Sequence, residues 1–294
     1  SLRAELHAYM PYKSVQNPDS GGSMIRINQS YGINHYDAIT GANKYTFRSG
    51  RESAQDVATA GTFLPDISGK NVVVFAQNNA FGQGNVAAVK AILGAKGATV
   101  TPVLVAEDVT EFTPFAQQVL SAKPDLVFVA WAGATTGAMW QSLSQQGVLD
   151  QIPVVTGLGD SSTFNAYGDA STKIKFLNHY FPGAPSNDVN TKMIDLITQA
   201  GGTPDLFSPD GFNAALMIVH AIQQGKGDVD QMISSLEGYT FDGPKGSNTV
   251  RAADHALIQD MYQVKLVANG SSFTPQLVDT VKGADVAPAP VTMK

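Results

Sequence analysis

The sequence predicts an α/β fold in which a parallel sheet is flanked by helices. Short apolar runs such as Val72–Phe75 and Leu126–Ala130 have the length and composition of strands buried on both faces. Segments with helical spacing of apolar residues lie between such runs, for example Phe115, Val119 and Leu120. Strands that alternate with helices form right-handed crossovers and therefore a parallel sheet.

Size and composition set limits on the class of protein. The 294 residues can bury a large core in one or two domains, and 43% of them are apolar without forming a run long enough to span a membrane. The 19 basic residues do not cluster, which argues against nucleic-acid binding, and the net charge is −6. The absence of cysteine excludes disulfides and cysteine metal sites. Ser1-Leu2-Arg3 does not begin a signal peptide, so we expect a mature, trimmed or incomplete product.

Residues 70–180 are expected to form one compact α/β unit. Its predicted strands are 71–77, 99–106, 126–130 and 152–156, and its predicted helices include 83–95 and 137–146. Another helix is expected to begin at Thr113 as N-cap, with Pro114 at the first helical position, where its missing N–H does no harm.

The pattern changes after Pro182–Pro185. Three helices without intervening strands are predicted at 187–200, 210–225 and 229–237, followed by a tight turn at 242–246 and one long or bent strand at 256–267. We expect an apolar stripe of the second helix to cover a sheet; it consists of Ala214, Ala215, Ile218, Val219 and Ile222. The first forty residues are polar and contain only Met24–Ile27 as a short candidate strand.

Two functional sequence patterns, one for dinucleotide binding and one for serine hydrolysis, are not met. Gly82–Ala87 fits the dinucleotide pattern GxGxxA, and Glu107 lies about two dozen residues further on. In that fingerprint the first glycine turns directly off the strand, whereas several residues precede Gly82 here, so close packing of helix and strand explains the glycines better. Gly157–Ser162 lacks the GxSxG motif of serine hydrolases. The five histidines have no metal-ligand spacing, and we predict no catalytic residue, metal or cofactor.

Aromatic and polar residues follow three neighbouring predicted strands. They are Asn79 and Phe81 after 71–77, Trp131, Ala134 and Thr135 after 126–130, and Asp160 after 152–156. Because the carboxyl ends of parallel strands meet at one edge, we expect these residues to form a ligand-binding site. Aromatic rings would shield a small zwitterion, helix N-termini would bind its anionic end, and Asp160 would attract its cationic end. The alternatives are that Asp160 caps a helix and that Phe81 and Trp131 pack beneath the loops.

Several segments occur together in a recognisable order and spacing. They are NKYTFRSGRESAQD (43–56), VVVFAQNNAFGQG (72–84), EFTPFAQQV (111–119), KPDLVFVAWAG (123–133), FDGPKGS (241–247), RAADHALIQDMYQVKL (251–266) and FTPQLV (273–278). With them the chain resembles the solute-binding proteins of ABC importers, in the branched-chain amino acid (Leu/Ile/Val) branch of the type I periplasmic-binding fold.

The resemblance implies two lobes, each a parallel sheet flanked by helices, that close about a hinge onto a ligand. It implies an atypical N-terminal segment and remnant of the first lobe at 1–50, the second lobe at 51–180, a helical return to the first lobe at 186–250, and the hinge recrossing, a second-lobe edge strand and the tail at 251–294. It places Phe81 against the ligand side chain, Ala134 and Thr135 in a second pocket loop, and Asp160 near the ligand's amino group.

The resemblance also implies partners. They are a small ligand, either an amino acid or a similar carboxylate, and the membrane permease of an ABC importer, in a periplasmic or extracytoplasmic location. The family's first strand–helix units with their GPLTG-like loop are missing, and Asp19–Ser23 is the candidate for its Ser/Thr-rich carboxylate loop. We therefore expect an incomplete first lobe and weak ligand binding or none. An α/β enzyme with a nucleotide or hydrolytic site and a sensory ectodomain of the same fold remain alternatives.

Overall fold

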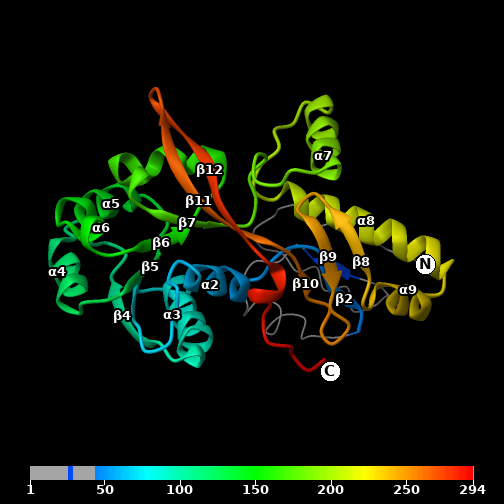
Figure 1. Cartoon of the computed structure of the whole chain (residues 1–294), viewed down its shortest axis with the longest axis horizontal. Coiled ribbons are helices and arrows are strands. Elements are labelled where there is room, and N and C mark those ends of the chain that lie inside the picture. Colours follow the sequence, from blue (N-terminus) through cyan, green and yellow to red (C-terminus); the bar gives the residue numbers. More distant parts are fainter. Residues whose placement is uncertain (1–25, 29–43, 294) are drawn as a thin grey trace. The chain divides into compact units, whose positions relative to one another are not determined.

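The computed structural model describes residues 26–28 and 44–293. The chain divides into two compact units (Figure 1). Of the described residues, unit 1 holds 26–28, 44–53, 180–260 and 282–293, and unit 2 holds 54–179 and 261–281. The chain therefore changes unit after residues 53, 179, 260 and 281. The predicted carboxylate loop at Asp19–Ser23 lies outside the described residues.

Unit 2 is built on a seven-stranded sheet with the order β12-β11-β7-β6-β5-β3-β4. The strands are β3 (Asn71–Gln77), β4 (Thr99–Val105), β5 (Leu126–Ala130), β6 (Val154–Gly157), β7 (Lys175–Asn178), β11 (Met261–Asn269) and β12 (Ser272–Val281). β3 to β7 pair in parallel, which confirms the prediction from the alternation of strands and helices. β11 and β12 add an antiparallel hairpin beside β7, so β4 and β12 are the two edges of the sheet.

Unit 2 contains the three predicted helices and further helices that were not predicted. They are α2 (Ser53–Gly61), α3 (Ala80–Ile92), α4 (Thr113–Ser121), α5 (Thr136–Gln145), α6 (Val148–Gln151) and the 3-10 helices η2 (Gly94–Lys96) and η3 (Ser161–Thr172). The predicted helices are α3, α4 and α5. The predicted N-cap of α4 is wrong by one position: Phe112 is the N-cap, and Thr113 is the first helical residue. The reason is that the Glu111 carboxylate accepts a hydrogen bond from the Thr113 N–H at 2.8 Å and so caps the helix from outside.

The direction of the crossovers reverses at β3. The chain leaves β3 through α3 to reach β4 on one side, and then crosses through α4 to β5 on the other side of β3. Right-handed crossovers therefore place α3 on one face of the sheet and α4 and α5 on the other. Such a reversal opens a crevice at the carboxyl ends of the two strands, which is where open α/β sheets bind ligands. In unit 2 the reversal lies between the carboxyl ends of β3 and β5.

Unit 1 contains the predicted run of helices and two small sheets. Its elements are β1 (Arg26–Asn28), β2 (Thr46–Arg48), α7 (Asp188–Gln199), α8 (Ser208–Gly225), α9 (Val229–Leu236), β8 (Thr240–Gly243), β9 (Gly246–Val250), β10 (Leu257–Ile258) and the 3-10 helix η4 (Gly283–Asp285). β1 pairs with β2 in parallel, and β8, β9 and β10 form an antiparallel sheet. The turn predicted at 242–246 is confirmed as the hairpin between β8 and β9.

The single strand predicted at 256–267 is wrong, because β10 ends at Ile258 and β11 begins at Met261. The side chains of the two residues between these strands form hydrogen bonds with residues outside β10 and β11. The buried Gln259 side chain accepts a hydrogen bond from Lys245 Nζ at 2.8 Å. The Asp260 carboxylate accepts bonds from the Gly283 N–H at 2.9 Å and from Lys282 Nζ at 3.0 Å.

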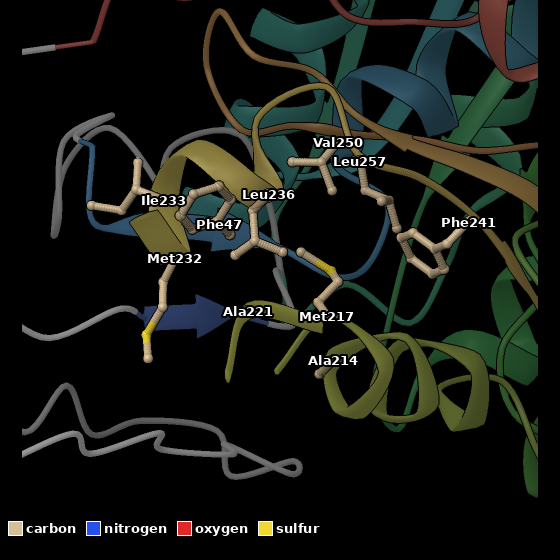
Figure 2. Close-up of a cluster of buried hydrophobic side chains, with 10 residues drawn as sticks. All are labelled: Phe47, Ala214, Met217, Ala221, Met232, Ile233, Leu236, Phe241, Val250 and Leu257. Carbon is tan, nitrogen blue, oxygen red and sulfur yellow. The ribbon is translucent and has the colours of Figure 1, made fainter. Parts of the chain in front are cut away.

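The predicted apolar stripe of α8 is right only in part: Ala214 and the partly buried Ile218 pack in the core, whereas the other members of the stripe are exposed. Figure 2 shows the core of unit 1, in which side chains from β2, α8, α9, β8, β9 and β10 meet. α8 contributes Ala214, Met217 and Ala221 to this core, whereas Val219 is 51% exposed and Ile222 46% exposed. The sequence does not show which face of α8 is buried, because the helix has apolar residues on opposite sides. In the structure α8 packs against α9 through the face that carries Met217 and Ala221.

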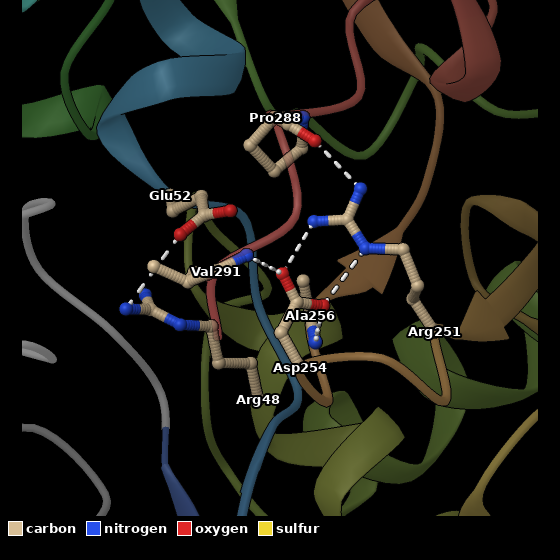
Figure 3. Close-up of polar contacts among 7 residues, drawn as sticks. All are labelled: Arg48, Glu52, Arg251, Asp254, Ala256, Pro288 and Val291. Carbon is tan, nitrogen blue, oxygen red and sulfur yellow. Dashed lines mark hydrogen bonds and ion pairs between the residues drawn. The ribbon is translucent and has the colours of Figure 1, made fainter. Parts of the chain in front are cut away.

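An ion pair between the partly buried Arg251 and the buried Asp254 holds the C-terminal segment of unit 1 (Figure 3). The Arg251 guanidinium donates to both carboxylate oxygens of Asp254, at 2.8 and 2.6 Å, and to the Pro288 carbonyl at 2.6 Å. The Val291 N–H donates to the same carboxylate at 3.0 Å. Burial opposes ionisation of Asp254, but the hydrogen bonds from Arg251, Val291 and Ala256 outweigh it and lower the pKa of this carboxyl.

His255, next to this pair, connects three segments of unit 1. Its fully buried ring stacks on Phe47 with 3.8 Å between ring centroids. Nδ1 lies 2.9 Å from the Thr46 carbonyl oxygen, and Nε2 lies 3.1 Å from a carboxylate oxygen of Glu237. This histidine therefore has a structural role in unit 1.

We predict that Asp254→Asn destabilises the protein by about 3 kcal/mol at pH 7, because it leaves the Arg251 charge without its partner. The pKa of Asp254 is lower in the folded than in the unfolded chain, so the stabilisation is complete above the unfolded value of about 3.9 and is lost as the pH falls through the folded value. Urea denaturation should show that the difference in the free energy of unfolding between the parent and Asp254→Asn is smaller near pH 2 than at pH 7. The exposed Asp242→Asn is the control, and a difference for Asp254→Asn that does not change with pH would contradict the prediction.

Candidate functional site

The predicted binding residues lie at the carboxyl edge of the unit 2 sheet, around the reversal of strand order. Asn79 and Phe81 follow β3, and Trp131, Ala134 and Thr135 follow its neighbour β5. Asp160 follows β6, one strand further from β3. With neighbouring strands about 4.8 Å apart, the ends of all three strands fall within about 10 Å.

Asn79 begins α3 and so determines where Phe81 lies. Asn79 is the N-cap, and its Oδ1 accepts a hydrogen bond from the Gly82 N–H at 2.9 Å. Phe81 is the second residue of the helix and is 53% exposed, so its ring does not pack beneath the loop. Gly82 lies directly against the end of β3, because a Cβ at this position would be 1.8 Å from the Gln77 carbonyl oxygen. This contact confirms that the glycine serves close packing of helix and strand.

Glu107, which the dinucleotide pattern would place on a ribose, has a different partner. Its carboxylate accepts a hydrogen bond from Asn79 Nδ2, so both ends of the Asn79 amide are bound within the protein. The Asn78 N–H also donates to the Val105 carbonyl at 2.7 Å. The loop that carries Phe81 is therefore attached to the end of β4. Sequence reasoning missed this role of Glu107, although a carboxylate after the adjacent strand was a usable signal.

Trp131 is partly buried, and part of its side chain is exposed to solvent. Its ring packs on Phe75, at 5.6 Å between centroids, and meets Phe112 edge to face at 5.3 Å. The indole Nε1–H donates to the Thr135 hydroxyl at 3.1 Å. Thr135 is the N-cap of α5 but makes no capping bond with its side chain, so no side chain caps this helix. The Thr136 N–H donates to the Gly133 carbonyl at 3.2 Å, which leaves the N–H groups of Gly137 and Ala138 in the first turn of α5 to face an anion, next to the exposed Ala134.

Asp160 caps the 3-10 helix η3, as the alternative interpretation predicted. Its Oδ1 accepts bonds from the Ser162 N–H at 3.1 Å and from the Ser162 hydroxyl. Behind this loop the Tyr167 hydroxyl donates to the Gly157 carbonyl at 3.2 Å. Burial raises the pKa of Tyr167, which keeps it a neutral donor. A ligand contact of Asp160 stays a prediction.

Gln77, the last residue of β3, connects the segment after β3 with the segment after β5. Its Nε2 donates to the Ala132 carbonyl at 2.9 Å, and its Oε1 accepts from the Ala132 N–H at 3.2 Å. Nothing in the sequence distinguishes this glutamine from the polar residues that follow it.

Other classes of site find little support in the part of the chain that the structure describes. Among residues 26–28 and 44–293, no group of three or more histidine, aspartate or glutamate side chains is placed to hold a metal ion. Within the same residues no helix is both long and apolar enough to cross a membrane.

A family of known proteins shares this architecture. The family described as periplasmic binding protein matches residues 30–271, which is most of the chain. The chain belongs to this family. A comparison with curated proteins finds no match.

Solved structures of similar proteins have the same fold. An ABC-type branched-chain amino acid transporter from Rhodopseudomonas palustris is 28% identical with a TM-score of 0.79, and the match covers 92% of this chain and 75% of that one. A leucine-, isoleucine-, valine-, threonine- and alanine-binding protein from Brucella ovis is 17% identical with a TM-score of 0.75, covering 92% and 74%. A solute-binding protein of an ABC transporter from R. palustris, in complex with 4-hydroxybenzoate, is 17% identical with a TM-score of 0.70, covering 88% and 72%. The predicted type I periplasmic-binding fold is thereby confirmed.

We predict that Gly82→Ala destabilises the protein by about 3 kcal/mol, because the new methyl group would displace α3 from the end of β3. Gly94→Ala is a matched control, since a Cβ there meets nothing within 4 Å and should change stability by less than about 0.5 kcal/mol. Urea denaturation of both variants measures the difference. Equal stabilities would show that α3 does not approach β3 this closely.

Proposed function

We propose that the chain is an extracytoplasmic solute-binding protein of an ABC importer, and that it captures an amino acid or a related small carboxylate. Membership of the periplasmic binding protein family supports the general role. The 28% identical relative, an ABC-type branched-chain amino acid transporter, supports the class of ligand and a membrane permease as partner. Closure of two lobes on the ligand and a periplasmic location follow from the same resemblance and stay predictions.

One observation carries the proposal: the exposed Phe81 and the partly exposed Trp131 follow the two strands at which the strand order reverses, and Trp131 is hydrogen-bonded to Thr135, the N-cap of α5, whose side chain makes no capping bond. A helix N-terminus binds a carboxylate through its free N–H groups and its dipole. Aromatic rings at the same place would cover the apolar part of the ligand. In this proposal Ala134 and Thr135 line the carboxylate position and Asn79 positions Phe81.

Asp160 completes the proposed site. It accepts bonds from Ser162, and its side chain remains partly exposed. A carboxylate in this position would attract the ammonium group of an amino acid, whereas an aromatic acid offers it no such group. The proposal therefore favours an amino acid over a simple aromatic carboxylate. It assigns no catalytic residue and no cofactor, since each of these side chains has a role in holding a loop or a ligand.

The test is isothermal titration calorimetry with L-leucine and 4-hydroxybenzoate. We expect saturable binding of L-leucine, and a loss of about tenfold or more in affinity for Phe81→Ala, because burying a phenyl ring contributes about 1.5–3 kcal/mol. Phe273→Ala, in a partly exposed aromatic of β12, is the matched control and should bind as the parent does. The predicted weak affinity is measured in the same titration.

Two results would overturn the proposal. One is a nucleotide retained by the native protein, detected by absorbance and mass spectrometry, which would support an α/β enzyme. The other is an unchanged affinity in Phe81→Ala, which would move the site away from β3.

A further inference from the structure

The Gln77 side chain extends the pairing of β3 and β5 by one step beyond the strands. The ladder between the two strands ends at the pair Ala76 and Ala130. Beyond it, the Gln77 amide donates to the Ala132 carbonyl at 2.9 Å and accepts from the Ala132 N–H at 3.2 Å. A primary amide offers one donor and one acceptor side by side, as a peptide group does, and so it can replace a rung of the ladder.

Gln77 also contacts the first turn of α3, which carries Phe81. Its main-chain carbonyl lies against Gly82, one residue after Phe81. Gln77 is therefore in contact with both loops that carry aromatic rings, through its backbone on the Phe81 side and through its side chain on the Trp131 side. Gln77 is buried at 7% exposure, so water competes little for these bonds.

The Ala132 loop depends on this contact. Its other hydrogen bonds are local: the Thr136 N–H and hydroxyl both donate to the Gly133 carbonyl, at 3.2 and 2.7 Å. Gly133 has a φ of 94°, so the chain turns sharply directly after Ala132. Besides the packing of the Trp131 ring on Phe75, the bonds from Gln77 connect this exposed stretch to β3 rather than to itself.

We propose that Gln77 is a positioning residue: it sets the separation between the Phe81 and Trp131 loops and thereby the affinity for the carboxylate ligand. The part that concerns affinity rests on the proposed function. The chemistry is specific, because only a side chain with both a donor and an acceptor satisfies the Ala132 peptide groups. A carboxylate in the same place would face the Ala132 carbonyl with a second acceptor and repel it.

The experiment compares Gln77→Leu with Gln83→Leu. Leucine has a similar volume without polar atoms, and Gln83 is an exposed glutamine of the same segment whose amide bonds only to Asn78. Acrylamide quenching of tryptophan fluorescence reports the exposure of Trp131 without any ligand. The chain's other tryptophan, Trp140, is 2% exposed, and its signal is measured in a Trp131→Phe variant and subtracted. We expect quenching of Trp131 to increase in Gln77→Leu, with roughly a tenfold loss of affinity for L-leucine, and neither change in Gln83→Leu.

A second variant separates positioning from loss of structure. Gln77→Glu should behave like Gln77→Leu at pH 7 and recover towards the parent near pH 4, where the introduced carboxyl is protonated and again has one donor and one acceptor. All values are taken relative to the parent at the same pH. Unchanged quenching in Gln77→Leu, or no recovery of Gln77→Glu at low pH, would overturn the proposal. If the parent binds neither L-leucine nor 4-hydroxybenzoate, the proposed function fails, while the quenching arm still decides whether Gln77 positions the Trp131 loop.

Discussion

The arrangement of unit 2 depends on β3 being paired on both edges and covered on both faces. Val72 to Ala76 are buried, and β3 forms a parallel ladder with β4 on one side and with β5 on the other. A strand in this position satisfies all of its peptide groups within the sheet, which is what allows it to be buried at all. β3 is also the first strand of this sheet along the chain, which adds β4 on one side of it and β5 on the other, so the direction of the crossovers reverses there.

The side chains around the crevice are mostly engaged with the protein itself. Asn79 uses both ends of its amide, the Trp131 indole N–H bonds to Thr135, and Asp160 caps η3. What remains for a ligand is mainly aromatic surface and the backbone N–H groups at the start of α5. Backbone donors recognise a carboxylate without regard to what is attached to it. Selectivity among amino acids would then come from the shape around Phe81, since Asp160 would attract the ammonium group of any of them.

Much of unit 2 could be predicted because its signals are local. The buried runs of β3 and β5, the helical spacing between them and the capping residues lie within a few positions of one another. The errors have a different origin. The buried face of α8, the break at Gln259 and the partners of Gln77 and Glu107 are decided by contacts between residues far apart in the sequence. The sequence could identify which strands end beside the predicted site residues, but not which polar groups there were already bonded.

Both edges of the unit 2 sheet carry a proline near the middle of the strand, Pro102 in β4 and Pro275 in β12. Proline has no N–H, so each outer row of donors is interrupted halfway along. A strand from another molecule that tried to extend the sheet would lose pairing at that point on either side. Polymerisation through these edges is thus disfavoured in the folded protein, which helps the chain to stay dispersed at high concentration.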